Sequence, residues 1–342
     1  MCATETTRSR PAAPTTPRPI NAASGLDGTN GRRAARVIRQ LAVLPLFLGL
    51  PALGATASQT PEPSPATLKV STEVVNVLAV VRDKDDRLVP DLTREDFELS
   101  EDNHAQAMRY FSRETDTPLL LGVLMDTSAS QKRVLPEERE RAKAFIRQVM
   151  QPQDQGFVLR FDRKAELLQG LTSHSKLLCR AIDSLVETAP TTHLFDAVKT
   201  ASEVLRKEDG RKVLVLLTDG FDTLSHTRLT TALHAAQEAD AVIYCLAVSD
   251  PWTGLMPFYR LRAQITLKKL SRGTGGRVIR VGPQHEMAQA FNEVAEELPT
   301  EYLLGYTSSN GKHDGKFRRI DVRACHGTCK VEARRGYYAP KD

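Results

Sequence analysis

The sequence predicts an α/β fold, a doubly wound and mostly parallel sheet with helices on both faces, together with a small β-rich module. Two observations predict it. From about residue 117 to residue 298, apolar segments of strand length alternate with amphipathic segments of helix length, as in parallel sheets covered by helices. On either side of this region, short strand patterns occur with few helix signals, so we expect the two flanks to pair into one accessory β module.

Composition is that of a globular protein and excludes two classes. The 342 residues are 41% hydrophobic and 26% charged, enough for about two domains. The formal charge of +5 arises within residues 1–57, which hold seven Arg and two acidic residues, while the rest of the chain carries 40 basic and 40 acidic side chains. Nucleic-acid binding relies on clustered positive charge, so we expect no nucleic acid partner. No later segment approaches 18 continuous apolar residues, which excludes a multi-span membrane protein.

The amino terminus, residues 1–57, has the pattern of a signal peptide with a long leader. Four Arg residues precede the apolar run Leu41–Leu53, and small residues follow up to Ala57. This run is shorter than the roughly 20 residues of a spanning helix, and two prolines interrupt it. We therefore predict an exported, periplasmic or extracellular protein, cleaved near Ala57 and without a stable membrane span afterwards. An uncleaved anchor is the alternative.

The elements follow in order. Residues 58–66 are a Pro-rich linker, and residues 67–115 are expected to form the N-terminal β module. The α/β domain is expected over residues 116–299, its strands from continuous apolar runs and its helices from one-face apolar spacing. The expected strands are 119–125, 157–161, 165–168, 213–217, 242–248 and 277–281, and the expected helices are 136–149, 175–185, 192–205, 228–239, 263–272 and 286–298.

Strand patterns return in the C-terminal β segment, residues 300–342, at 302–306, 318–324 and 330–338. The segment Cys325-His-Gly-Thr-Cys329 separates the last two. A three-residue hairpin loop there would place the two cysteines opposite each other, so we expect a disulfide in an exported protein, with two free thiols as the alternative. Cys179 and Cys245 lie in apolar segments and are expected to be buried thiols.

Polar residues follow two of the expected buried strands and open one helix. The first strand ends in a D-x-S-x-S segment, the other in T-D-G, and an isolated Thr begins the helix between them. Loops at the carboxyl ends of strands converge in an open α/β sheet. We therefore expect one small volume surrounded by Asp126, Ser128, Ser130, Thr192 and Asp219. Hydroxyl and carboxylate oxygens suit Mg²⁺, or Mn²⁺, and leave the ion able to accept one further anionic oxygen.

These motifs resemble the von Willebrand factor A-type (VWA) domain, the family that includes integrin I domains. The D-x-S-x-S, the isolated Thr and the T-D-G match its metal ion-dependent adhesion site (MIDAS), and the element order over residues 116–298 agrees as well. The phrases Asp96-Phe-Glu-Leu99 and Arg334-Arg-Gly-Tyr-Tyr338 are similar to a bacterial subgroup of exported VWA-related proteins with β segments on either side.

The resemblance implies roles for the five residues. Ser128, Ser130 and, in the ligand-ready state, Thr192 would bind the metal directly, whereas the two Asp residues would act mainly through water. One departure is Pro190-Thr191, where the family often has Gly-Gly, and it leaves Thr191 as an alternative to Thr192. Taken singly, each residue also has an ordinary interpretation: Thr192 as a helix N-cap, the serines as caps, and the T-D-G as a turn.

The sequence thus predicts a metal-dependent protein-binding module in which a partner's Asp or Glu carboxylate completes the Mg²⁺ shell. We expect no enzyme, since the G-x-S-x-G and H-E-x-x-H motifs are absent. Two alternatives stay open: a hydrolase using metal-bound water, and a structural subunit of an envelope assembly. The charged run Glu137–Arg141 is interpreted as a solvated helix face, and Trp252, Phe258 and Tyr259 as core or partner-facing residues.

Overall fold

A computed structural model of the chain describes residues 74–341 apart from 114–116, 188, 249–256 and 283–284. The expected leader, its cleavage site, the linker and Trp252 lie outside these residues. Among the described residues, no helix combines the length and the apolar character needed to cross a membrane.

The expected alternation of strands and helices builds a six-stranded sheet in the described part of the chain. Its order is β10-β9-β8-β5-β6-β7, and every neighbouring pair is parallel except β6 and β7. The strands are β5 (Leu119–Asp126), β6 (Gln155–Phe161), β7 (Ala165–Thr172), β8 (Arg211–Thr218), β9 (Val242–Val248) and β10 (Val278–Val281). The interior strands are almost wholly apolar because both of their faces are covered.

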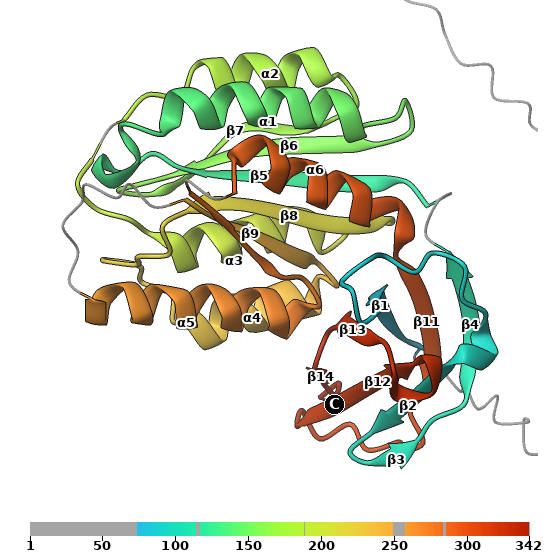
Figure 1. The fold of residues 1–342 in the computed structure, drawn as a ribbon. Helices are drawn as coiled ribbons and strands as arrows, with labels where there is room; N and C mark the ends of the chain where they lie inside the picture. The colour runs from blue at the N-terminus through green and yellow to red at the C-terminus, as the bar shows by residue number, and fades with distance from the viewer. Residues whose placement is uncertain (1–73, 114–116, 188, 249–256, 283–284, 342) are drawn as a thin grey trace, which may run out of the picture. The chain divides into compact units, whose positions relative to one another are not determined.

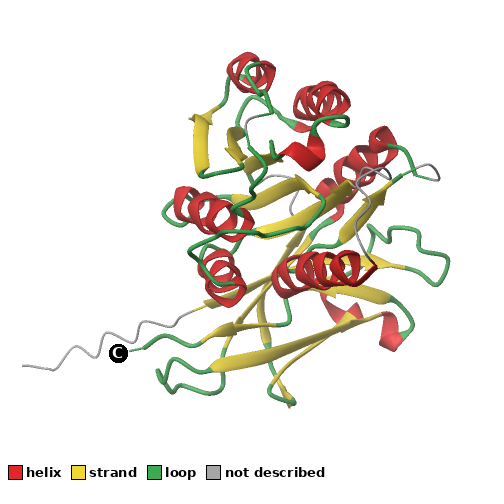
Figure 2. Ribbon diagram, turned by 90° about the vertical axis from the view of Figure 1, so that its left-hand side faces the viewer, coloured by secondary structure: helices red, strands yellow, loops and turns green. Residues whose placement is uncertain are grey.

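Helices cover both faces of this sheet (Figures 1 and 2). One face carries α1 (Leu135–Val149), α2 (Ser175–Asp183) and α6 (Met287–Glu297), and the other carries α3 (Leu194–Leu205), α4 (Leu229–Glu238) and α5 (Pro257–Thr274). Alternate residues of β5 serve the two cores: Leu121 packs toward α1, and Leu124 toward α3. Gly122 lets a neighbouring ring approach, since a Cβ there would lie 2.4 Å from Phe157. The predicted fold class is confirmed.

The two flanks pair with each other, also as predicted, in two four-stranded antiparallel sheets. Their orders are β13-β1-β11-β4 and β14-β12-β2-β3. The strands are β1 (Val74–Arg82), β2 (Phe97–Glu101), β3 (His104–Ala105), β4 (Met108–Arg113), β11 (Tyr302–Thr307), β12 (Phe317–Ala324), β13 (Lys330–Ala333) and β14 (Gly336–Tyr338). Because β1 pairs with β11 and β2 with β12, segments from both ends of the described chain share one core.

The expected hairpin at the cysteines is wrong. β12 pairs with β2 and β14, whereas β13 pairs with β1, so the turn Cys325–Gly327 connects two different sheets. The expected strand 330–338 is divided into β13 and β14 for the same reason. The cysteines nevertheless form a disulfide, with Cα atoms 5.5 Å apart, and Cys179 and Cys245 are buried free thiols.

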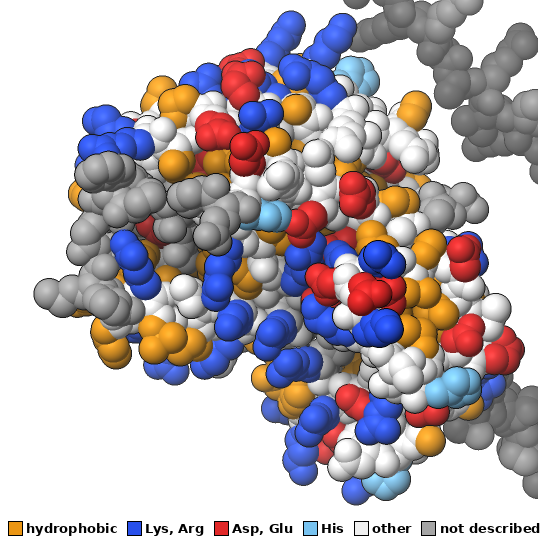
Figure 3. Space-filling view, viewed as in Figure 1, with side chains coloured by type: hydrophobic (Ala, Val, Ile, Leu, Met, Phe, Trp, Pro, Cys, Tyr) orange, Lys and Arg blue, Asp and Glu red, His pale blue; other side chains and the backbone are white. Residues whose placement is uncertain are grey.

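The surface carries both signs of charge. Figure 3 shows Lys and Arg side chains interspersed with Asp and Glu on the face viewed, in keeping with equal numbers of both after residue 57. Phe258 and Tyr259, at the start of α5, are 68% and 48% exposed. Of the two interpretations of these aromatic residues, the structure therefore favours a surface position over the core.

Candidate metal-binding site

Two polar segments meet at the carboxyl ends of β5 and β8. These strands are parallel neighbours, and Asp126 and Thr218 end them side by side. The Thr218 hydroxyl donates a 2.6 Å hydrogen bond to Asp126 Oδ2. Asp219 follows, and Gly220 then turns the chain with a φ of 86°, where a Cβ would lie 2.8 Å from Leu267. The D-x-S-x-S and T-D-G segments therefore lie next to each other.

The D-x-S-x-S segment is held by its own side chains. The Ser128 N–H donates a 3.0 Å hydrogen bond to Asp126 Oδ1, and the hydroxyl oxygens of Ser128 and Ser130 lie 3.1 Å apart. The side chains of Ser130 and Gln131 lie close enough to Asp219 to counter part of the rise in its pKa. Three of the five expected site residues, Asp126, Ser128 and Ser130, are thus connected by direct contacts, and Asp219 adjoins Thr218, which hydrogen-bonds to Asp126.

The loop before α3, which carries Thr192, is tied to both segments. The Ala129 N–H donates to the Ala189 carbonyl at 2.8 Å, which holds that loop against the D-x-S-x-S segment. The Thr192 N–H donates to Thr223 Oγ1 at 2.8 Å, and its carbonyl accepts from the Thr223 N–H, which ties the loop to the chain after T-D-G. Thr192 is buried and lies two residues before α3, and His193 occupies the N-cap position. The N-cap interpretation of Thr192 is therefore wrong.

The two aspartates have unfavourable electrostatic surroundings: Asp126 is buried and Asp219 is half-buried. Asp126 is fully buried, and burial, with the negative charge of Asp219 second, raises the pKa of Asp126 to about 7. Burial likewise raises the pKa of Asp219, against hydrogen bonds that lower it. Among the described residues, neither carboxylate forms an ion pair with a Lys, Arg or His side chain. Their charges are therefore balanced by protons or by a cation from outside the chain.

A third carboxylate, Glu138, lies near these two and was missed at the sequence level. It is fully buried on the face of α1 that packs on the sheet, so the interpretation of Glu137–Arg141 as solvated is wrong here. Neither of its oxygens has a hydrogen-bond partner in the described part of the chain. Burial, and then the charges of Asp126 and Asp219, raise the pKa of Glu138 well above its usual range.

The spacing of apolar residues in α1 could have predicted that Glu138 is buried. The residue lies three positions after Leu135 and four before Ala142, and both of these are buried on the same stripe of α1. Charged side chains are almost never fully buried in an apolar stripe unless another group pairs with them. We call the group formed by Asp126, Asp219 and Glu138 the acidic cluster.

The donor chemistry at this place fits a small divalent cation. Serine hydroxyls and aspartate carboxylates gather here, with the Ser128 and Ser130 hydroxyls in contact and Asp126 bonded to the Ser128 N–H, and these hard oxygens are the ligands that Mg²⁺ and Mn²⁺ prefer. Imidazole and thiolate groups, which favour Zn²⁺, do not contact the acidic cluster among the described residues. Positive charge supplied there would also relieve the repulsion between the carboxylates.

Comparison with known proteins agrees with this arrangement. A family model described as the von Willebrand factor type A domain matches residues 121–221, a range that contains both the D-x-S-x-S and the T-D-G segments. A search of curated proteins gave no match.

Solved structures with a similar fold include three bacterial proteins. The conserved hypothetical protein BatB from Bacteroides thetaiotaomicron is 16% identical, with a TM-score of 0.43, over 53% of this chain and 97% of that one. The vWF domain of the type V pili tip protein Mfa5 from Porphyromonas gingivalis is 12% identical, with a TM-score of 0.44, over 53% and 94%. A von Willebrand factor type A protein from Catenulispora acidiphila is 13% identical, with a TM-score of 0.47, over 72% and 73%. From the family model and the strand order, the chain contains a von Willebrand factor type A domain.

Proposed function

We propose that this chain is an exported protein-binding module that holds Mg²⁺, or Mn²⁺, and presents it to an Asp or Glu carboxylate of a partner protein. VWA domains are often used for protein–protein interaction. The observation that carries the metal is the acidic cluster, in which Asp126 and Glu138 are buried and no carboxylate has an ion-pair partner among the described residues. An uncompensated buried charge costs several kcal/mol, so binding of a cation here would stabilise the folded chain.

The residues of the proposed site differ in what they contribute to metal binding. Ser128, Ser130 and Thr192 supply neutral hydroxyl oxygens, while Asp126 and Asp219 supply the negative charge. A bound divalent ion provides a Lewis acid whose remaining charge favours an anionic oxygen over a neutral one. A glutamate or aspartate side chain of a partner meets that requirement. The carboxylate is therefore the first determinant of partner binding, and the surrounding loops add specificity to it.

Export rests on the amino-terminal pattern and on the disulfide. The apolar run and small residues before position 58 support a leader, and a disulfide between Cys325 and Cys329 is typical of oxidising compartments. Mass spectrometry of the mature chain is expected to give a first residue near position 58. An intact Met1 in the exported fraction would contradict cleavage.

Magnesium binding and partner capture test the proposal together. Ser128→Ala removes one hydroxyl oxygen from the site, and we expect it to abolish the heat of Mg²⁺ binding in calorimetry. Ser173→Ala is the matched control, because Ser173 is exposed, lies just before α2 and takes part in none of the contacts described for the site. Unchanged Mg²⁺ binding by the Ser128→Ala variant would overturn the assignment.

Capture is measured on immobilised full-length chain with partner proteins from the exported proteome. We expect capture in Mg²⁺, loss in chelator, and recovery when Mg²⁺ or Mn²⁺ is restored. Replacing the acidic residues of a captured partner by their amides is expected to abolish binding. Capture that persists unchanged in chelator would refute the mechanism even if the metal site exists.

The hydrolase alternative requires a general base beside an open metal position. Glu138 is the further carboxylate near the site, but its complete burial leaves it no access to a substrate or to solvent. Recovery of captured partners as intact chains after prolonged incubation is the result that we expect. Cleaved partners would favour the hydrolase.

A further inference from the structure

Three metal-ligating side chains gather beside the acidic cluster but separately from it. His193 directly precedes α3, Asp196 lies in the first turn of that helix, and His226 belongs to the loop between β8 and α4. One ligand atom from each lies within 4.8 Å of the other two. We call these residues the imidazole–carboxylate cluster.

The spacing of the cluster matches tetrahedral coordination. Asp196 Oδ2 lies 3.2 Å from His193 Nδ1 and 3.4 Å from His226 Nδ1. Ligand bonds of about 2.0–2.1 Å at tetrahedral angles place neighbouring ligand atoms about 3.3–3.4 Å apart. Both measured separations are therefore close to what a four-coordinate ion requires, and the third position falls within reach of a small side-chain rotation.

The carboxylate is fixed by contacts other than the imidazoles. Asp196 Oδ1 accepts a 2.9 Å hydrogen bond from the Thr227 N–H, and Oδ2 accepts one of 3.0 Å from the His226 N–H. The Asp196 N–H is in turn bonded to the Ser225 hydroxyl at 3.2 Å. Such surrounding hydrogen bonds orient a ligand before the metal arrives, so little ordering remains to oppose binding.

Exposure leaves one side of the cluster open. The His193 side chain is 9% exposed and its ring lies 5.6 Å from that of His226, whereas the His226 side chain is 89% exposed. An ion can therefore enter from solvent, and a fourth position remains for water or an exogenous ligand. Two imidazoles with one carboxylate are typical ligands of Zn²⁺ and neighbouring divalent transition metals, and they are poor ligands of Mg²⁺.

We propose that His193, Asp196 and His226 form a second metal site, selective for Zn²⁺-class ions over Mg²⁺. The ordinary alternative is a hydrogen-bonded group in which both imidazoles donate to one carboxylate oxygen. The proposal does not depend on the acidic cluster. It does bear on it, because His193 is adjacent to Thr192, so an ion bound here fixes the loop that carries Thr192.

Cobalt substitution distinguishes the two sites by the visible absorption of bound Co²⁺ as well as by their metal affinities. Co²⁺ held by nitrogen and oxygen in tetrahedral geometry absorbs visible light strongly, whereas octahedral Co²⁺ among oxygens absorbs weakly. We expect the full-length, untagged chain to develop the strong bands with Co²⁺ and to lose them when Zn²⁺ is added. His226→Ala is expected to abolish the bands and to weaken Zn²⁺ binding about 100-fold or more, since even outer contacts of a ligand are worth about 10–100-fold.

Matched variants make the result decisive. His226→Ala removes an exposed ring, and thermal unfolding of the metal-free variant is expected to match that of the wild type. His174→Ala, at another exposed histidine, is expected to retain the bands and the Zn²⁺ affinity. Ser128→Ala should lose Mg²⁺ binding and keep the cobalt bands, whereas His226→Ala should show the reverse. Weak octahedral spectra in the wild type, or Zn²⁺ binding that His226→Ala leaves unchanged, would overturn the proposal.

Discussion

Two sets of buried carboxylates in this molecule have opposite surroundings. At the junction of α6 with the β module, Glu297 is fully buried and forms ion pairs with Arg82 and Arg277. Within the β module, Glu101 is buried against Arg318 at 3.4 Å. In the acidic cluster, Asp126 and Glu138 are buried to the same degree and Asp219 is half-buried, yet among the described residues the charged neighbours of Asp126 and Glu138 are other carboxylates.

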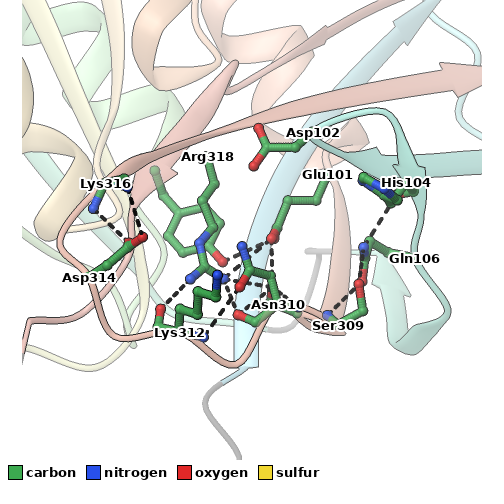
Figure 4. A network of polar contacts seen from close by, with 12 residues as sticks. Glu101, Asp102, His104, Gln106, Ser309, Asn310, Lys312, Asp314, Lys316 and Arg318 are labelled. Atoms are coloured by element: carbon green, nitrogen blue, oxygen red, sulfur yellow. Dashed lines mark hydrogen bonds and ion pairs between the residues drawn. The ribbon is translucent and has the colours of Figure 1, made fainter.

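Figure 4 shows the network of polar contacts around Glu101 and Arg318 in the β module. Glu101 accepts hydrogen bonds from the hydroxyls of Tyr306 at 2.7 Å and Ser308 at 2.6 Å. The Arg318 guanidinium also donates to the carbonyls of Asn310 and Lys312. Glu101 and Arg318 thus have their partners within the chain, so this network is self-sufficient.

This contrast predicts where an ion from solution would offset buried negative charge. Burial of a carboxylate is costly wherever it occurs, and a fold can offset the cost with its own guanidinium or leave it to be met from solution. In the β module, the guanidinium groups of the chain offset the cost, which favours rigidity. At the acidic cluster, compensation is left to the solution, so we expect its stability to depend on protons and cations.

The largest expected effect comes from breaking the self-sufficient network. Arg318→Met leaves Glu101 buried without its cation, and we expect the free energy of unfolding to fall by about 3–5 kcal/mol. Chemical denaturation measures it, and Mg²⁺ is expected to restore nothing. The neighbouring exposed residue gives the control, with Arg319→Met changing stability by no more than about 0.5 kcal/mol. A loss of equal size in both variants would remove the contrast.

An intermediate effect is expected from pH acting on the acidic cluster. Because burial raises the pKa of Asp126 to about 7, the folded chain keeps a proton that the unfolded chain releases near its ordinary pKa of 3.8. The contribution of Asp126 to stability in chelator should therefore be greatest below about pH 4 and fall as pH rises from about 4 to 7, by up to about 4 kcal/mol. Thermal unfolding across that range, with and without Mg²⁺, measures the slope.

Two comparisons isolate this slope from other titrations. Asp126→Asn removes the titrating group, so its stability should depend less on pH than that of the wild type. Saturating Mg²⁺ should flatten the wild-type curve by holding the carboxylates ionised. Equal slopes in wild type and Asp126→Asn would show that the cluster is not the source.

The smallest effect concerns Glu138 and has the opposite sign to the first. Glu138→Met replaces a buried, unpartnered carboxyl by an apolar group of similar length on an apolar stripe of α1. We expect the metal-free protein to gain about 1–2 kcal/mol of stability, and Mg²⁺ to bind more weakly. Glu137→Met, at an exposed neighbour, should stay within about 0.5 kcal/mol. Destabilisation by Glu138→Met would mean that the carboxyl already has a partner.

Local patterns in the sequence were sufficient for much of the fold and part of the candidate site. The apolar run of β5 and the one-sided stripes of the helices predicted the layers, because burial on two faces or on one leaves a direct trace in periodicity. The D-x-S-x-S and T-D-G segments were located at strand ends for the same reason. Glu138 was misread because its charge was considered without its position on the α1 stripe.

Pairings between distant segments could not be read in this way. The strand patterns on either side of Cys325 and Cys329 suggested a hairpin, yet β12 and β13 belong to different sheets. His193 and His226 are separated in sequence and meet only because the loop after β8 folds against the start of α3. Strand propensity and residue type record local preference and carry no information about partner choice.

The order of elements, the apolar faces and the oxygen-rich loops at strand ends could be predicted from local patterns, since these follow from period and composition over a few residues. Which buried carboxylates have an arginine partner, and which do not, depends on the folded chain. Compensation of a buried charge depends on groups brought together through space, such as Glu101 and Arg318, 217 positions apart. That arrangement separates the self-sufficient network from the site that we propose to hold a cation.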